Sequence, residues 1–150
     1  MKTVILFVLT TLLTQLVVAQ EKKVIFVCEH GAAKSVIAAS YFNKMAKERN
    51  LDYVAECRGT FPDSVVSPGV KDGLTKDKVF DPNTKPQKLL ISDTVNVERI
   101  ILFTTLPPEL KTNIKTENWS NIQNVDAEYE KRRNAITKKI NELLDSLEKQ

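Results

Sequence analysis

The sequence predicts an α/β domain, a three-layer sandwich with a central, mostly parallel four-stranded sheet and helices on both faces. Two observations predict it. Short apolar runs rich in β-branched residues alternate along the chain with stretches whose apolar residues recur at helical spacing, as in a parallel sheet with crossover helices. The length of 150 residues fits one domain, and the sequence contains no internal repeat and no interdomain linker.

The domain is expected to begin with a strand, a loop and a helix. Val24–Val27 is a continuous apolar run, typical of a strand that is buried on both faces. A loop of small residues follows, and Ser35 is a good N-cap for a helix that continues to about Asn50. A second strand is expected from Tyr53, ending at the segment Cys57–Thr60.

The middle of the chain is expected to hold more loop. Residues 61–98 are richer in Pro, Asp and Lys, and we expect short helices there, near Gly69–Lys76 and near Gln87–Ile91. Arg99–Phe103 is again apolar and β-branched, which predicts a third buried strand.

The last part of the chain is expected to complete the sheet and cover it. Residues 115–119 are predicted as a short edge strand that ends at Trp119. A long helix is expected from about Ala127 to Glu148, because its apolar residues form one stripe. The stripe consists of Ile136, Ile140, Leu143, Leu144 and Leu147.

Residues 1–19 have the three-part pattern of a secretory signal peptide. Lys2 supplies a positive start, Val4–Val18 is almost wholly apolar, and Ala19 ends a cleavage-site pattern of small residues. The apolar run of about 15 residues is shorter than the roughly 20 that span a bilayer. We therefore expect cleavage after Ala19, leaving residues 20–150 as a secreted or periplasmic domain that is not bound to a membrane.

The composition excludes several classes of protein. The chain has 22 Lys and Arg residues against 19 Asp and Glu, widely interspersed, so it lacks the clustered basic face of a nucleic-acid-binding protein. Two cysteines and one histidine are too few for a disulfide-rich fold, a four-cysteine zinc site or a histidine-rich metal enzyme. We therefore expect neither a metal nor an organic cofactor.

The chemistry is expected in the loop after the first strand, where Cys28 precedes small residues and then Lys34 and Ser35 at a helix start. Loop amides that turn inward form a nest for an oxyanion, and the helix N-terminus adds partial positive charge. Lys34 adds a full charge, and such surroundings favour the thiolate of Cys28. A nucleophilic sulfur in an anion nest predicts attack on the central atom of a bound phosphate or similar oxyanion.

This arrangement resembles the low-molecular-weight protein tyrosine phosphatase superfamily, which includes the thioredoxin-coupled arsenate reductases. The family's signature is an apolar strand, Cys, five residues, Arg and then Ser or Thr, and Cys28–Ser35 reads Cys-Glu-His-Gly-Ala-Ala-Lys-Ser. Ala55–Thr60 is similar to the family's Ser-Ala-Gly-Thr segment, and Trp119 and the closing helix also fall where the family places them. The likeness covers roughly residues 22–148.

The resemblance implies roles for these residues. Cys28 is the nucleophile, Lys34 stands where the family's phosphate-binding Arg would be, and Ser35 hydrogen-bonds the thiolate. Asp126 is the nearest match to the family's general acid, which lies in an Asp-Pro pair before the last helix. The amides that cradle the anion belong to Glu29, His30, Gly31, Ala32, Ala33, Lys34 and Ser35.

Three departures from the family's pattern bear on the function. The ammonium of Lys34 cannot give the planar two-point grip of a guanidinium, which is expected to cost about 2–4 kcal/mol in the transition state. Asp126 is followed by Ala instead of Pro, and it is equally suited to cap the last helix. Gly31 replaces a frequent Asn, and it supplies left-handed backbone without steric cost.

Other polar residues are interpreted as surface. His30 is expected to be an exposed side chain of the loop, since the sequence offers it no partner motif. The pairs Arg132-Arg133 and Lys138-Lys139 are expected on a solvated face of the last helix. Tyr129 either flanks the mouth of the site or begins the apolar face of that helix.

The sequence thus predicts an exported phosphatase-like enzyme that hydrolyses a phosphate monoester, phosphotyrosine among the candidates, through a cysteinyl-phosphate. The alternatives are an arsenate reductase-like thiol enzyme and a non-catalytic oxyanion-binding module. Reduction needs a second thiol, and after Cys28 only Cys57 is available, whereas the family's reductases usually keep a further pair late in the chain. In an oxidising compartment the two cysteines either form a disulfide or stay as a nucleophile and a buried free thiol.

Overall fold

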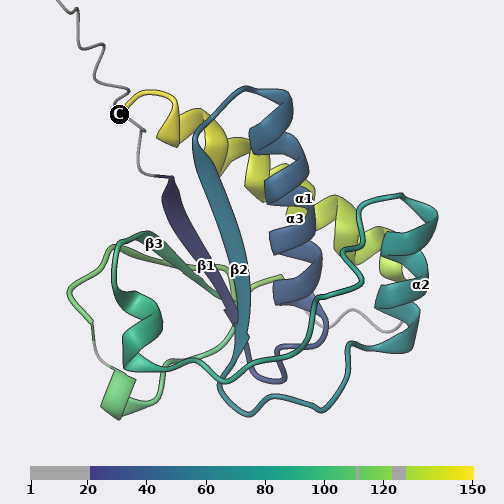
Figure 1. The fold of residues 1–150 in the computed structure, drawn as a ribbon, viewed down its shortest axis with the longest axis horizontal. Coiled ribbons are helices and arrows are strands. Elements are labelled where there is room, and N and C mark those ends of the chain that lie inside the picture. Colours follow the sequence, from purple (N-terminus) through teal and green to yellow (C-terminus); the bar gives the residue numbers. More distant parts are fainter. Residues whose placement is uncertain (1–20, 111, 123–127) are drawn as a thin grey trace, which may run out of the picture.

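The structure, a computed structural model, describes residues 21–110, 112–122 and 128–150. Its centre is a four-stranded sheet with strand order β2-β1-β3-β4, in which every pair of neighbours is parallel (Figure 1). The predicted four-stranded α/β fold is therefore confirmed. The strands are β1 (Lys22–Cys28), β2 (Tyr53–Gly59), β3 (Val97–Leu102) and β4 (Thr116–Asn118).

Strand β1 is the most deeply buried element of the sheet. It lies between β2 and β3, and the side chains of Val24–Val27 are fully inaccessible to solvent. This is the two-sided burial that a continuous apolar run predicts. The edge strand β4 has only three residues, none of them buried.

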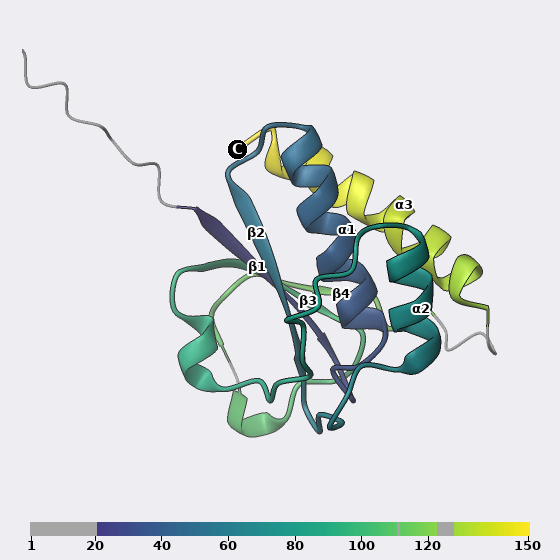
Figure 2. The same ribbon diagram turned by 45° about the vertical axis from the view of Figure 1, so that its right-hand side comes forward.

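All three α-helices cover one face of the sheet, and Figure 2 shows α3 behind α1 with its start beside α2. In a parallel α/β fold the helices that follow strands begin at the carboxyl edge of the sheet. The first turns of α1 and α3 are therefore at the same end of the molecule. The helices are α1 (Lys34–Glu48), α2 (Pro68–Lys76) and α3 (Tyr129–Leu147). The predicted apolar stripe of α3 is buried throughout.

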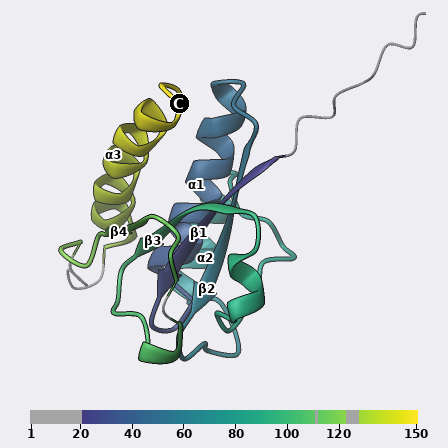
Figure 3. The same ribbon diagram turned by 90° about the vertical axis from the view of Figure 1, so that its left-hand side faces the viewer.

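The opposite face of the sheet carries a smaller core and no α-helix among the described residues. Ile25, Val27 and Ile100 pack there against Leu89. Figure 3 shows this side covered by the segment that includes two single 3-10 turns. The helical layer expected on this face thus consists of η1 (Ile91–Thr94) and η2 (Pro108–Leu110).

One expectation about local structure is wrong, and another falls on residues that the structure does not describe. The short helix expected near Gln87–Ile91 does not form, because Gln87 and Leu89 exchange backbone hydrogen bonds with Gly59 at the end of β2. The isolated pairing of Gly59 with Lys88 extends the sheet there instead. The predicted signal peptide lies outside the described residues. Within the described part of the chain, no helix has the length and apolar character to cross a membrane.

Candidate active site

Cys28 is the last residue of β1, and its side chain points to the face that α1 and α3 cover. It is nearly buried, and its Sγ lies 3.0 Å from the Oγ of Ser35. The prediction that Ser35 caps the helix is wrong, because α1 begins at Lys34 with Ala33 in the cap position. The Ser35 hydroxyl is instead fully buried against the sulfur, which is the contact that the family resemblance implies.

The loop after Cys28 has its carbonyl oxygens turned away from the helix and held by the segment 60–67. Four backbone N–H groups of that segment donate to four carbonyls of the loop. The pairs are Thr60 to Cys28 at 3.1 Å, Phe61 to Glu29 at 2.8 Å, Asp63 to His30 at 3.0 Å and Ser67 to Ala32 at 3.0 Å. Because the carbonyls are fixed outward, the peptide N–H groups of the loop are directed to its inner side.

Those N–H groups are open. Among the described residues, no backbone N–H of residues 29–33 donates a hydrogen bond. Gly31 and Ala32 are buried and Ala33 is half-buried, and buried amides of a native protein nearly always have a partner, so these free donors indicate a candidate ligand site. They lie at the N-terminus of the 15-residue helix α1, where the macrodipole also favours an anion.

Two glycines allow the loop to pack tightly against the end of β2. Gly31 has a φ of +60°, a conformation that glycine adopts without strain. A Cβ on Gly31 would lie 3.0 Å from the nitrogen of Gly59, and a Cβ on Gly59 would lie 2.8 Å from the nitrogen of Gly31. The shape of the loop therefore depends on Gly59 as much as on its own residues.

Lys34 begins α1 and is half-buried beside the loop. Its Nζ donates to the carbonyl oxygen of Ile122 at 3.4 Å and lies 5.8 Å from the centroid of the Phe103 ring. Burial lowers the pKa of Lys34, the negative charge of a Cys28 thiolate raises it, and the positive charge of Arg132 lowers it. The ammonium thus lies within electrostatic range of the sulfur and of a second cation.

The rim of the loop carries exposed polar and aromatic side chains. His30 is exposed, as expected, and its Nδ1 lies 3.2 Å from the Oδ1 of Asp63. The Glu29 side chain is similarly exposed. Phe61, whose backbone N–H donates to the Glu29 carbonyl, has a side chain that is 69% exposed. These side chains lie at the rim of the candidate site.

The expectation of a solvated face for Arg132-Arg133 is wrong. The Arg133 guanidinium donates to Asp77 at 3.1 Å, and the Nε of Arg132 is inaccessible to solvent. The Oδ2 of Asp77 also accepts from the hydroxyls of Tyr41 and Tyr129, at 2.6 and 2.7 Å. Tyr129 therefore joins α3 to the end of α2. No sequence signal marks this cluster, because it joins residues from three helices.

Cys57, the predicted redox partner, is a buried free thiol in the structure, as is Cys28. It pairs with Phe26 across the sheet, whereas Cys28 pairs with Gly59. Strand spacings of about 4.8 Å laterally and about 3.3 Å per residue then place the two Cα atoms about 8 Å apart. A disulfide requires about 4.4–6.8 Å, so the pair is close but not in bonding position.

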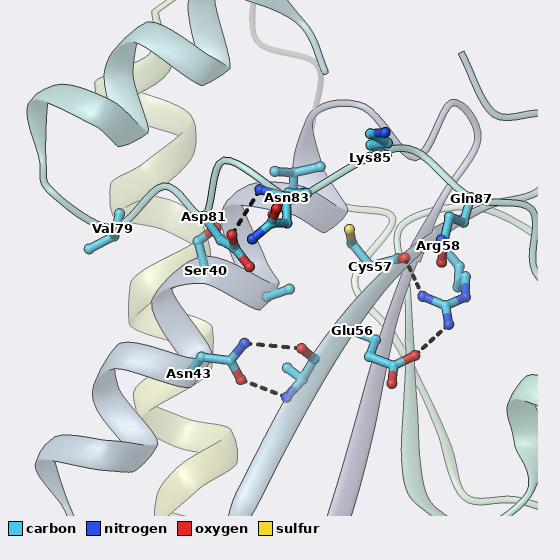
Figure 4. Close-up of a pocket in the computed structure, with 14 residues that line it drawn as sticks. Ser40, Asn43, Glu56, Cys57, Arg58, Val79, Asp81, Asn83, Lys85 and Gln87 are labelled. Atoms are coloured by element: carbon cyan, nitrogen blue, oxygen red, sulfur yellow. Dashed lines mark hydrogen bonds and ion pairs between the residues drawn. The ribbon is translucent and has the colours of Figure 1, made fainter. Parts of the chain in front are cut away.

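The sulfur of Cys57 points into a pocket of about 540 Å³ between α1, β2 and residues 79–87 (Figure 4). Ser40 and Asn43 line it from α1, and Asn83 and Lys85 from the loop. The side-chain amide of Asn43 exchanges two hydrogen bonds with the backbone of Ala55, at 2.6 and 3.0 Å. Burial raises the pKa of Cys57 to about 11, so this thiol stays protonated near neutral pH.

Asp126, the predicted general acid, lies outside the described residues. The structure therefore brings together Cys28, the loop amides, Lys34 and Ser35 of the predicted set. The described residues contain no group of three metal-ligating side chains that could hold an ion.

Comparison with known proteins finds similar structures but no similar sequences among family models and curated proteins. No protein-family model and no curated protein matches the chain. Solved structures do match it. A low-molecular-weight protein tyrosine phosphatase from Bacillus subtilis is 15% identical with a TM-score of 0.71, covering 85% of this chain and 97% of that one. One from T. tengcongensis is 17% identical with a TM-score of 0.64, covering 85% and 98%.

Arsenate reductases have the same architecture. The arsenate reductase from Archaeoglobus fulgidus is 25% identical with a TM-score of 0.64, covering 81% of this chain and 98% of that one. These neighbours agree with the superfamily that the loop sequence resembles. The chain therefore has the fold of the low-molecular-weight protein tyrosine phosphatases and arsenate reductases.

Proposed function

We propose that the protein is a cysteine-dependent phosphatase that hydrolyses a phosphate monoester without a metal. One observation carries this proposal. A buried cysteine, with a hydroxyl 3.0 Å from its sulfur, ends β1 directly before a loop at a helix N-terminus, and the amides of that loop have no partner among the described residues. The loop amides, the dipole of α1 and the charge of Lys34 all favour a bound oxyanion. The sulfur of Cys28 is the nucleophile beside that oxyanion.

The reaction takes two displacements. The Cys28 thiolate attacks phosphorus, the bond from phosphorus to the ester oxygen breaks, and the leaving alcohol takes a proton from the predicted acid, Asp126. Water then attacks the cysteinyl-phosphate, so that the sulfur–phosphorus bond breaks and inorganic phosphate and the thiolate are released. The loop amides and Lys34 stabilise the charge on the three equatorial oxygens, and the Ser35 hydroxyl donates to the sulfur as it becomes a leaving group.

Arsenate reduction is the second candidate. It is favoured by the position of Cys57 on the strand beside Cys28, on the same face of the sheet. Reduction of arsenate to arsenite takes two electrons, which two thiols supply by forming a disulfide. With the Cα atoms about 8 Å apart, the end of β1 would have to move toward β2 by more than an ångström for Cys57 to attack Cys28.

Hydrolysis of p-nitrophenyl phosphate tests the first proposal. We expect turnover in the wild type that is absent in Cys28→Ser. Arsenate-dependent formation of a disulfide, lost in Cys57→Ser, with no hydrolysis of the ester, would contradict it in favour of the reductase. Protection of Cys28 from iodoacetate by phosphate, with neither reaction, would identify an oxyanion-binding module.

We also propose that the protein is exported, with residues 1–19 as a cleaved signal peptide. The pattern of Lys2, the apolar run Val4–Val18 and Ala19 supports this. The intact mass of protein recovered from the extracytoplasmic fraction is the measurement, and we expect it to begin at Gln20. A mass that includes the first 19 residues would contradict the proposal.

A further inference from the structure

We propose that Phe103 is a positioning residue of the candidate site, and that its ring, together with the carbonyl of Ile122, holds the Lys34 ammonium beside Cys28 to bind the oxyanion. The inference rests on the proposed function, because it assumes that an oxyanion binds in the Cys28 loop. It assigns the position of the cation to residues that lie far from the loop in the sequence.

Phe103 lies beside Cys28 at the carboxyl edge of the sheet. Strands β1 and β3 are parallel with Val27 opposite Leu102, and the N–H of Phe103 donates to the carbonyl of Val27 at 2.8 Å. Continuing this register by one residue places Phe103 opposite Cys28, about 4.8 Å away across the sheet. Both side chains belong to the core on the face that α1 and α3 cover. A group over the Phe103 ring is therefore on the same face of the sheet as the Cys28 sulfur.

Lys34 is such a group. Its Nζ lies 5.8 Å from the centroid of the Phe103 ring, within the range at which a cation is attracted to an aromatic face. The same Nζ donates to the carbonyl oxygen of Ile122 at 3.4 Å, and within the described ranges this is the only hydrogen bond of the Lys34 side chain. An ammonium has three N–H groups, so these contacts leave a donor for an oxyanion.

The ring and the carbonyl that contact Lys34 are both anchored to the sheet. The Phe103 side chain is buried, and its ring centroid lies 6.4 Å from that of Phe26 and 5.9 Å from that of Trp119. The N–H of Trp119 donates to the last residue of β3 at 2.7 Å, and the N–H of Ile122 donates to the carbonyl of Trp119 at 3.0 Å. Because its two contacts are fixed in this way, the ammonium has less conformational freedom to lose when an anion binds.

The partial burial of Lys34 makes these contacts important for its charge. Burial lowers the pKa of Lys34, and a Cys28 thiolate raises it. The smaller effects of Arg132 and Glu29 lower and raise this pKa, respectively. An aromatic face and a carbonyl oxygen favour the charged ammonium, yet neither carries a full negative charge. These neutral partners therefore hold the cation without cancelling the charge that an oxyanion needs.

The test changes the electron density on the ring face while nearly keeping the shape of the ring. A trifluorinated phenylalanine in place of Phe103 withdraws electrons from the face and weakens its attraction for a cation. The measurement is the Kd of the full chain for phosphate, obtained from protection of Cys28 against alkylation by iodoacetate. We expect the Kd to rise about threefold to tenfold, with a smaller rise for a monofluorinated phenylalanine.

Phe42 provides the matched control. Its side chain is fully buried, and its ring centroid lies 5.7 Å from that of Phe26, the ring on which Phe103 also packs. Among the described residues, no cation lies over the Phe42 ring. The same trifluorinated residue in place of Phe42 should therefore change the Kd for phosphate less than twofold.

A double-mutant cycle separates positioning of the cation from packing of the core. In Lys34→Gln, where no ammonium faces the ring, fluorination of Phe103 should leave the Kd within twofold of that of Lys34→Gln alone. A purely structural role of the ring would give the same change in both backgrounds and would overturn the proposal. Circular dichroism checks the fold of each protein, and should the trifluorinated protein unfold, the monofluorinated one decides.

The results separate the role of Phe103 from the oxyanion site itself. If phosphate does not protect the wild type, the oxyanion site is wrong, and the role of Phe103 fails with it. If phosphate protects the wild type but Lys34→Gln binds it equally well, Lys34 is no ligand, and only the further inference is overturned. An unchanged Kd on fluorination of Phe103 has the same consequence. A lower Kd would mean that Lys34 has to leave the ring to reach the anion, which also overturns the inference.

Discussion

Two polar clusters differ in how completely their groups are paired. The Oδ2 of Asp77 accepts three hydrogen bonds, from Tyr41, Tyr129 and Arg133. The loop after Cys28 is the reverse, because residues 29–33 offer amides that donate to no described group. The Asp77 cluster satisfies its own charge and holds three helices together. The Cys28 loop leaves its amide donors without a described partner, which is the pattern that a binding site is expected to show.

The two thiols show the same difference. Cys28 has the hydroxyl of Ser35 3.0 Å from its sulfur, and it precedes the loop that leads to the N-terminus of α1. Cys57 is held in an environment that keeps it neutral, since burial raises its pKa to about 11. Their surroundings, rather than the residue type, therefore favour Cys28 over Cys57 as the nucleophile that we propose.

The largest expected effect comes from removing the proposed nucleophile of the Cys28 loop. Cys28→Ser should lower turnover of p-nitrophenyl phosphate by at least about 1,000-fold, because a serine hydroxyl stays protonated where a thiolate would attack. Steady-state hydrolysis measures this, with circular dichroism to show that the fold is kept. Full turnover in Cys28→Ser would remove Cys28 from its role.

The second effect concerns the close contact between the backbones of Gly31 and Gly59, which shapes the loop after Cys28. Gly59→Ala introduces a Cβ 2.8 Å from the nitrogen of Gly31, which forces the backbone to shift. We expect a loss of about 1–3 kcal/mol in the free energy of unfolding and a fall in turnover of at least about tenfold. Gly69→Ala is the control, since a Cβ there meets nothing within 4 Å. Equal behaviour of the two variants would show that the loop is not shaped by this contact.

The third effect concerns the Asp77 cluster, which is weakened when the Asp77 carboxylate is protonated. Hydrogen bonds from Tyr41 and then Tyr129 lower the pKa of Asp77 from 3.8 to about 2. A carboxyl whose pKa is depressed on folding stabilises the protein above its unfolded pKa, and that stability is lost as the pH falls through the range from 3.8 to about 2. The contribution at neutral pH is at most about 2 kcal/mol.

Urea unfolding of Asp77→Asn between pH 2 and 7 measures this contribution. The variant should be about 1–2 kcal/mol less stable than the wild type at pH 7, and the difference should vanish near pH 2. Asp72→Asn, at an exposed position of the same helix, should change stability by less than about 0.5 kcal/mol at either pH. A stability difference that does not depend on pH would mean that the carboxylate charge of Asp77 contributes nothing.

The smallest effect is expected at the second thiol. At pH 8 only about one Cys57 thiol in a thousand is ionised with a pKa of about 11, so iodoacetamide should label Cys28 far faster than Cys57. Cys57→Ala should leave hydrolysis of p-nitrophenyl phosphate within twofold of the wild type. Mass spectrometry of the labelled peptides gives the ratio of rates. Comparable labelling of both cysteines would contradict the distinction between them.

The sequence by itself determined the four-stranded α/β fold and identified the loop after Cys28 as the candidate site. Val24–Val27 and the stripe of the last helix have periodicities that identify their elements, because burial of a strand or a helix face depends on local spacing. The run Cys28–Ser35 identifies a candidate site for the same reason, since strand end, loop and helix start are contiguous in the chain. The predicted helix near Gln87–Ile91 failed because pairing with Gly59 is a long-range contact.

Only the tertiary structure decided how the loop is held and what lies around it. The segment 60–67 that fixes the loop carbonyls is more than 25 residues away in sequence. Arg132 and Arg133 are adjacent in the chain, yet Arg133 is paired with Asp77, whereas the Nε of Arg132 is buried without a hydrogen-bond partner among the described residues. Local patterns cannot distinguish these two arginines. Their environments are set by which other helices pack against each side of α3, and the free energy of that packing comes from contacts between distant residues.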